Sequence, residues 1–271
     1  WPTYFSRAKG CKIWDLNKKQ YYDMSLMGVG TNILGYSNKE VDNAVKKAIN
    51  DSTISTLNCA EEVLLAEKLI DIHSWADKVK FARTGGEANA LAIRIARAAS
   101  GKEKVAFCGY HGWHDWYLAA NLKSKRSLDQ HLIKGLNPLG VPKSLSNSSF
   151  GFEYGNFKNL VTLTQKHNIG VIKMEVCRNT QPNVSFLKSV RKLASQKKIV
   201  LIFDECTTGF RQTYGGIHKT LGINPDIAIL GKALGNGYPI TAVLGKEEIM
   251  NSAKNSFMSS TFWSERIGPV A

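Results

Sequence analysis

The chain lacks the features that mark membrane-spanning, secreted and zinc-binding proteins. No run of about 18 apolar residues occurs, so the sequence predicts no transmembrane helix. Its first residues lack the basic flank and apolar core of a secretory signal. The five cysteines are scattered, odd in number and without a CxxC pair, which argues against a disulfide framework and a zinc site. These absences predict a cytoplasmic protein with reduced thiols.

Motifs for nucleotide binding and serine hydrolysis are missing as well. No GxxxxGK[ST] phosphate loop and no GxSxG elbow occur in the sequence. The segment that begins at Gly28 has Ile33 where the third glycine of a dinucleotide fingerprint would stand. The sequence therefore excludes the common phosphate-loop and nucleophile-elbow enzymes.

Long charge runs are absent too, although the chain is strongly basic. Lysine and arginine number 36 against 22 acidic residues, which gives a formal net charge of +14. Clustered basic residues would predict nucleic-acid binding, but no run of five or six like charges occurs. A basic nucleic-acid-binding protein without catalysis is kept as a rival hypothesis, and a small anionic ligand also fits the charge.

The patterning that is present alternates helices with buried strands. Amphipathic spacing predicts helices at 38–51, 60–73, 86–100 and 185–198. Short apolar runs predict buried strands at 104–108, 169–176, 199–205 and 226–232. This alternation predicts an α/β fold with a mostly parallel sheet flanked by helices. The Ser-, Asn-, Gly- and Pro-rich stretch from about 121 to 157 predicts a long functional loop.

Polar groups gather at the ends of the predicted strands. Ligands of open α/β sheets bind outside the carboxyl ends of the strands. The residues predicted at this edge are Tyr110, His111, Glu175, Asp204, Glu205 and Lys232. Lys232 lies in the apolar, glycine-rich segment ILGKALGNGYPI. One interpretation is that its side chain extends along the apolar surface to place the ammonium group in solvent. The other is that a pocket holds it as a reactive amine of lowered pKa.

Thr84, Gly85 and Gly86 stand directly before a strong helix pattern. Backbone amides at a helix N-terminus, with glycines that allow close approach, suit a phosphate group. The alternative is a simple capping turn, because threonine is a good N-cap and Glu87 favours the first helical turn.

Three further side chains have both a structural and a functional interpretation. Tyr110 could present its ring to a planar ligand or pack in the core. Asp204 could hold a protonated ring nitrogen or cap the next turn. His111 and His114 have HxxH spacing, but the segment offers no further ligands in a defined geometry, so no metal site is predicted.

Five ordered motifs carry a family resemblance: TGGEANALAIRIAR, YHGWHD, IKMEV, LIFDECTTGFR and LGKALGNGYPI. Together they resemble the class III aminotransferases, pyridoxal-phosphate (PLP) enzymes of fold type I, and are most similar to the glutamate-1-semialdehyde aminomutase branch. The resemblance extends from about Gly10 to Thr261. It implies that 36–271 form the PLP-binding large domain and 1–35 an N-terminal segment of the small domain. It further implies a fragment, with the C-terminal small domain missing.

The resemblance implies the catalytic and ring-binding roles. Lys232 would form the internal aldimine with the cofactor aldehyde and then move the proton between substrate carbon and cofactor. Asp204 would pair with the pyridinium nitrogen and keep the ring an electron sink. Glu175 would lie near the ring hydroxyl or the substrate, and Cys206 would pack under the ring.

The resemblance also implies how the rest of the cofactor is held. Thr84, Gly85 and Gly86 would bind the phosphate through backbone and hydroxyl donors. Tyr110 would stack on the ring, and His111 would help to shape that wall.

A homodimer is implied as well, because Thr261 resembles the threonine that reaches the phosphate of the partner subunit.

Departures from the family pattern occur at Gly86, where a hydroxyl residue is usual, and at Val176, where proline is usual. The segment after Thr261 differs from the aminomutase pattern.

The implied activity is PLP-dependent transfer of an amino group between an amine donor and a carbonyl acceptor. The first rival hypothesis is an intramolecular aminomutase that uses the same residues. The second is a non-catalytic basic protein that binds nucleic acid, and the third is an inactive dimerising scaffold. The identities of donor and acceptor stay open.

Overall fold

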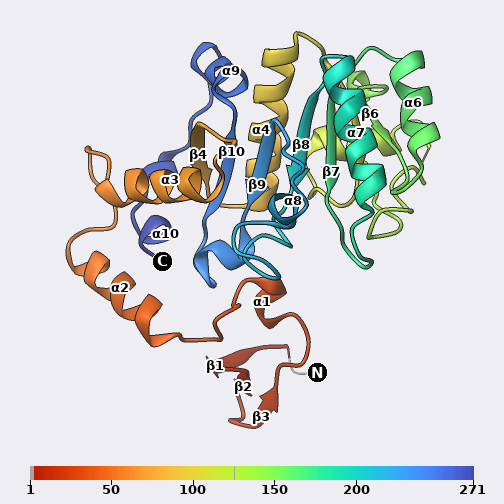
Figure 1. Cartoon of the computed structure of the whole chain (residues 1–271). Coiled ribbons are helices and arrows are strands. Elements are labelled where there is room, and N and C mark those ends of the chain that lie inside the picture. The colour runs from red at the N-terminus through yellow and green to blue at the C-terminus, as the bar shows by residue number, and fades with distance from the viewer. Residues whose placement is uncertain (1–2, 125) are drawn as a thin grey trace.

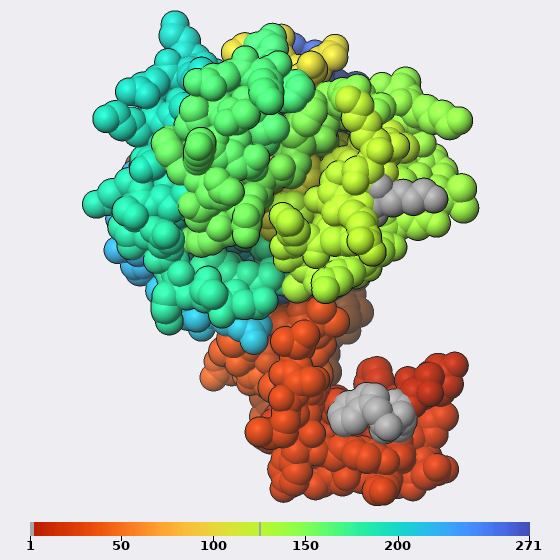
Figure 2. All heavy atoms as spheres, turned by 90° about the vertical axis from the view of Figure 1, so that its right-hand side faces the viewer, coloured from red at the N-terminus to blue at the C-terminus, as the bar shows by residue number. Residues whose placement is uncertain are grey.

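The computed structural model describes residues 3–124 and 126–271. A large body contains a seven-stranded sheet with helices on both faces, and the N-terminal residues form a small separate sheet (Figure 1). In Figure 2 the N-terminal residues, in red and orange, project from this body as a lobe. Within the described residues, no helix is long and apolar enough to cross a membrane.

The strands belong to these two sheets. They are β1 (Phe5–Lys9), β2 (Lys12–Asp15), β3 (Gln20–Tyr22), β4 (Lys78–Ala82), β5 (Lys104–Cys108), β6 (Ser149–Gly151), β7 (Ile169–Glu175), β8 (Val200–Asp204), β9 (Ile227–Leu230) and β10 (Thr241–Gly245).

The α-helices connect and cover the strands. They are α1 (Met27–Gly30), α2 (Lys39–Asn50), α3 (Ala60–Ile72), α4 (Gly85–Ser100), α5 (Asp115–Leu118), α6 (Phe157–Lys166), α7 (Val184–Gln196), α8 (Ile217–Thr220), α9 (Glu247–Met250) and α10 (Ile267–Val270). The short 3-10 helix η3 (Lys232–Gly235) follows β9, and a second one, η5 (Thr261–Ser264), precedes α10.

The large sheet has the strand order β4-β10-β9-β8-β7-β5-β6. Strands β9, β8, β7, β5 and β6 pair in parallel, whereas β10 runs antiparallel to both β4 and β9. One apolar cluster packs α4 against one face, and a second packs α6 and α7 against the other. The parallel arrangement brings the carboxyl ends of β5, β7, β8 and β9 to a single edge of the sheet.

The structure confirms the predicted mostly parallel α/β sheet, with all four predicted strands and four predicted helices present as β5, β7, β8, β9, α2, α3, α4 and α7. Gly101 follows the last residue of α4 with φ 64, the left-handed conformation that glycine commonly adopts at the end of a helix. The prediction was wrong in treating 121–157 as loop throughout, because β6 adds a short edge strand beside β5. Its three residues are too few to show a periodic pattern.

The N-terminal lobe is an antiparallel meander of β1, β2 and β3. The chain then returns to the body, where the Leu34 backbone N–H donates to Asn236 Oδ1 at 2.8 Å. The Asn236 amide donates in turn to the Gly35 carbonyl at 3.3 Å. These bonds hold the 28–35 segment against the turn that follows Lys232.

Candidate active site

Lys232 begins the turn directly after β9. An added Cβ on Gly231 would lie 3.0 Å from Thr241 Cγ2 and 3.3 Å from Cys206 Sγ, so the backbone before the lysine is tightly enclosed. Lys232 has φ 47, a left-handed conformation that costs an L-residue about 1–2 kcal/mol. Strain of this kind persists where the surrounding structure enforces it, and it occurs preferentially at functional sites.

The Lys232 ammonium group is half-buried and faces the end of β8. Its Nζ donates a hydrogen bond to Thr207 Oγ1 at 3.0 Å. Burial lowers the pKa of Lys232, and the charge of Arg178 acts in the same direction. On the opposite side, an added Cβ on Gly30 would lie 3.8 Å from Lys232 Cδ. The amine is thus enclosed by the body and by the 28–35 segment.

Asp204 ends β8 and is buried among donors. Its Oδ2 lies 2.8 Å from His111 Nδ1 and 3.1 Å from Lys173 Nζ, and its Oδ1 accepts from the Cys206 N–H at 3.1 Å. Burial opposes ionisation of this carboxyl, but the charge of Lys173 and the hydrogen bond with His111 outweigh it, holding the pKa of Asp204 well below its usual range. Burial lowers the pKa of His111 to about 4, so the ring is neutral.

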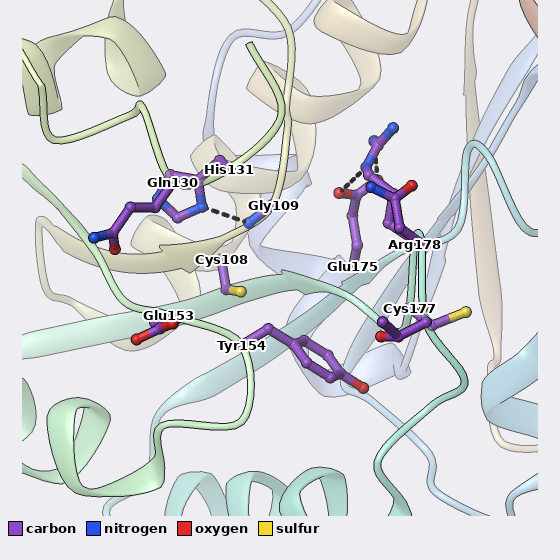
Figure 3. Close-up of a pocket in the computed structure, with 11 residues that line it drawn as sticks. Cys108, Gly109, Gln130, His131, Glu153, Tyr154, Glu175, Cys177 and Arg178 are labelled. Carbon is purple, nitrogen blue, oxygen red and sulfur yellow. Dashed lines mark hydrogen bonds and ion pairs between the residues drawn. The ribbon is translucent and has the colours of Figure 1, made fainter. Parts of the chain in front are cut away.

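Glu175 ends β7 beside the glycine turn after β5. Its Oε2 accepts from the Tyr110 backbone N–H at 3.0 Å. Arg178 donates from Nε to the same oxygen at 2.8 Å and makes a second bond to Oε1 (Figure 3). An added Cβ on Gly109 would lie 2.5 Å from Glu175 Oε2, so glycine is required there. Burial raises the pKa of Glu175, and Arg178 partly offsets this.

The N-terminus of α4 lies at the same edge of the sheet. Thr84 caps it, with its hydroxyl accepting from the Glu87 N–H at 3.3 Å while the Glu87 carboxylate accepts from the Thr84 N–H. An added Cβ on Gly85 would lie 3.8 Å from Cys206 Sγ. The first N–H groups of a helix lack intrahelical partners, so those of Gly85 and Gly86 are available to an anion.

Gly86 stands where the family pattern has a hydroxyl residue, and the structure gives the reason. An added Cβ there would lie 2.6 Å from Cε1 and 2.7 Å from Nδ1 of His114. The His114 ring therefore takes the space that the larger residue would need. His114 Nδ1 is buried and has no hydrogen-bond partner within the described part of the chain.

A cavity of about 140 Å³ adjoins the Glu175–Arg178 pair. His131, from the loop between α5 and β6, lies on its wall and accepts the Gly109 N–H at Nδ1 over 3.0 Å (Figure 3). The cavity wall also includes Tyr154 and Cys177. The predicted functional loop thus fixes the glycine turn that carries Tyr110.

Thr261 and Glu205 differ from the remaining predicted residues in position. Thr261 is exposed on η5, and Trp263 of the same 3-10 helix donates to Glu87 Oε1 at 2.7 Å.

Glu205 was expected at the edge with Asp204, and that expectation was wrong. Its carboxylate, directly after β8, is fully buried and accepts from Thr208 and from His218.

Sequence reasoning missed four residues of this site: Lys173, Arg178, Thr207 and His131. The signal for Lys173 was present, since it lies in the interior of a predicted buried strand and a lysine is rarely buried without a charge partner. The remaining three lie in loops, where no periodicity predicts which way a side chain points.

Comparisons with known proteins agree with this architecture. The family model "Aminotransferase class-III" matches residues 1–270. The chain is 34% identical to the 3-aminobutyryl-CoA aminotransferase of Cloacimonas acidaminovorans, covering 100% of this chain and 64% of the relative. It is 35% identical to the glutamate-1-semialdehyde 2,1-aminomutase of Sulfolobus acidocaldarius, covering 97% of this chain and 63% of the relative. The chain thus spans less than two thirds of the length of these curated relatives.

Solved structures give the same result for the fold. An ω-transaminase from Sphaerobacter thermophilus superposes with a TM-score of 0.88 at 25% identity, covering 100% of this chain and 65% of that one. The FumI protein of a Sphingopyxis species, solved in its PLP internal aldimine form, also has a TM-score of 0.88 at 25% identity, with coverage of 100% and 63%. The sheet and its flanking helices are those of the fold type I transaminases. On these matches, the chain belongs to the class-III aminotransferase family.

Proposed function

We propose that this chain binds pyridoxal 5'-phosphate and transfers an amino group between an amine donor and a carbonyl acceptor. The observation that carries the proposal is the half-buried Lys232 amine, of lowered pKa, at the same sheet edge as the buried, ionised Asp204. Membership of the class-III aminotransferase family supports it. The similar fold of the Sphingopyxis protein, which was solved with PLP as an internal aldimine, supports it too.

The residues present fit this cofactor. The α4 N-terminus offers N–H donors of Gly85 and Gly86 and the Thr84 hydroxyl to a phosphate. Asp204 offers a carboxylate to a ring nitrogen. Cys206 Sγ lies close to the backbone of both Gly85 and Gly231, where it would pack under the ring. Tyr110, held by Glu175 at its N–H, would stack on the ring, and His111 would shape the wall behind it.

The chain's own residues then have distinct tasks. The cofactor supplies an aldehyde for the amine and a ring that withdraws electrons from the substrate carbon. Lys232, with its lowered pKa, is the group able to take up and return a proton there, and Thr207 orients its Nζ. Asp204 would keep the ring nitrogen protonated, and Glu175 with Arg178 would form a polar wall near the ring hydroxyl or the substrate.

An intramolecular aminomutase is the second candidate. Relatives named glutamate-1-semialdehyde 2,1-aminomutase, including that of Nitrosopumilus maritimus at 36% identity, favour it. The two reactions differ in their requirement for a second substrate. A transaminase consumes an amine donor and needs a separate carbonyl acceptor, whereas an aminomutase turns over a single amino aldehyde alone.

The proposal includes a homodimer in which Thr261 reaches the partner's phosphate site. Its support is the exposure of Thr261 on η5, next to exposed Phe262.

We also propose that 1–35 belongs to the small domain and 36–271 to the large domain, because the 1–35 segment carries its own sheet. The five unpaired cysteines, all within the described residues, support a cytoplasmic location.

The test is borohydride reduction of the purified chain with pyridoxal phosphate, followed by peptide mapping. Because Lys232 has a lowered pKa and an enclosed position, the pyridoxyl group is expected on Lys232, and a visible absorption band should precede reduction. Exposed Lys188 on α7 serves as the comparison peptide. A label spread evenly over both peptides, in place of a Lys232 preference, would refute the proposal.

A further inference from the structure

Lys173 lies in the middle of β7 with its side chain completely buried. It pairs with Ile202 of the neighbouring strand β8, two residues before Asp204. From there its Nζ reaches Asp204 Oδ2 at 3.1 Å. A lysine is almost never fully buried without a charge partner, so this position serves the carboxylate rather than the core.

The cluster around Asp204 is balanced in charge within the chain itself. His111 lies 2.8 Å from the same Oδ2, and burial with the Lys173 charge keeps its imidazole neutral. Lys173 therefore supplies the positive charge that compensates the buried carboxylate. Removing one member of a buried ion pair leaves an uncompensated charge, which is strongly destabilising, whereas removing both can be nearly neutral.

The proposed function adds a third group, because Asp204 would also face the cofactor's ring nitrogen. We propose that Lys173 is a positioning residue that keeps Asp204 ionised and in place before the cofactor binds, and afterwards shares that carboxylate with the ring nitrogen. This inference rests on the proposed function. Since two cations divide the attraction of one carboxylate, Lys173 also weakens the hold of Asp204 on the protonated ring.

The first experiment concerns the cofactor-free chain and needs no catalysis. Lys173→Met keeps the side-chain volume but removes the charge, and it is expected to lower the melting temperature by roughly 10 °C. The double variant Lys173→Met with Asp204→Asn, which removes both charges, is expected to regain at least half of that loss. Ile172→Val, on the opposite face of β7, is the control for ordinary core loss.

The second experiment measures how cofactor binding changes these melting temperatures at pH 8.5, where the neighbouring His111 stays neutral. With pyridoxal phosphate, the gain in Lys173→Met should exceed the wild-type gain by about 5 °C, because the ring nitrogen then compensates Asp204. Ile172→Val should gain as much as the wild type. A carbocyclic analogue, with carbon in place of the ring nitrogen, should give Lys173→Met no extra gain.

The outcomes separate the two proposals. A wild-type chain whose melting temperature does not respond to pyridoxal phosphate contradicts the proposed function, and with it the sharing of Asp204. A wild-type response with an equal gain in Lys173→Met overturns the role of Lys173 alone. A double variant no more stable than Lys173→Met overturns charge compensation in the cofactor-free chain, and shows Lys173 to be a packing residue.

Discussion

At Lys232, an unfavourable backbone conformation and an unfavourable site for a charge coincide in one residue. Its φ of 47 places the Cβ close to the following carbonyl, and its amine is removed from water beside Thr207. The backbone on either side is fixed by the fold, because Gly231 is tightly enclosed and Asn236 is hydrogen-bonded to the backbone of Leu34. The candidate nucleophile is therefore held in place by its backbone as well as by its side chain.

The strain at Lys232 is measurable with two variants that both lack the amine. Lys232→Gly is expected to be more stable than Lys232→Ala by about 0.5–1 kcal/mol. The relief of left-handed strain, about 1–2 kcal/mol, exceeds the extra freedom that glycine has in the unfolded chain, about 0.4–1 kcal/mol. Urea unfolding of the two variants gives the difference.

Lys188 provides the matched control, since it is exposed within α7 and has ordinary helical geometry. There the glycine variant should be the less stable of the pair by about 1 kcal/mol. If glycine were also the less stable choice at position 232, the backbone there would carry no strain.

Single site residues could be predicted from the sequence where a local pattern distinguished them from their neighbours. Lys232 and Asp204 end apolar strands, so position in the sequence alone indicated the edge of the sheet. Lys173 and Arg178 were not predicted, because their roles depend on partners that only strand pairing and the loop after β7 bring near. Their charges are balanced by contacts, which no periodicity encodes.

Among the elements, α4 and the loop between α5 and β6 do most to shape the site. Helix α4 has a capping box at Thr84 and a left-handed glycine at its end, both readable from the sequence. The loop was predicted to be functional, but not how it acts. It places His131 under the Gly109 turn, where an acceptor is needed for a backbone N–H.

This loop contact makes stability depend on pH in a definite direction. Burial lowers the pKa of His131 to about 4, below the usual value of 6.5. Protonation at Nδ1 would also remove the acceptor for the Gly109 N–H. Its contribution to stability is therefore complete above pH 6.5 and is lost as the pH falls toward 4.

His131→Gln keeps a carbonyl acceptor but cannot titrate. Between pH 6.5 and 4, its unfolding free energy should fall less steeply than that of the wild type, by up to about 1.4 kcal/mol per pH unit. Urea titrations at half-unit pH steps measure the slope. Some slope should remain, because the pKa of His111 is lowered in the same direction. Identical slopes for the two proteins would contradict a buried, neutral His131.

On the scale of the whole molecule, the seven-stranded sheet runs through the body and the small sheet of β1, β2 and β3 lies apart from it (Figure 1). The 28–35 segment closes over Lys232 from the side of the N-terminal lobe. Large apolar side chains stay exposed near η5, with Phe257 87% and Phe262 60% exposed. The proposed homodimer would cover these two side chains, since large apolar side chains are commonly buried where chains associate.

The proposed homodimer predicts that two defective chains repair each other. If each site takes Lys232 from one chain and Thr261 from its partner, a mixture of Lys232→Ala and Thr261→Ala chains forms one intact site per mixed dimer. Each mixed dimer should then bind one pyridoxal phosphate tightly, which is half the number that a wild-type dimer binds. Equilibrium dialysis measures it, with each variant alone as control.

Binding in the mixture equal to the average of the two separate variants would show that Thr261 serves its own chain or no site at all. Sedimentation of the wild-type chain at micromolar concentration gives the accompanying mass. A monomer there would contradict the dimer directly.

The sequence by itself determined the alternation of strands and helices, the α4 caps, and the positions of Lys232 and Asp204 at strand ends. These features depend on the spacing of neighbouring residues, which local sterics and hydrophobic burial translate into structure. The tertiary structure alone decided that Lys173 compensates Asp204, that His131 supports Gly109, and that Glu205 turns away into the core. Such contacts join residues distant in sequence, and they exist because strand order and burial bring opposite charges and hydrogen-bonding groups together.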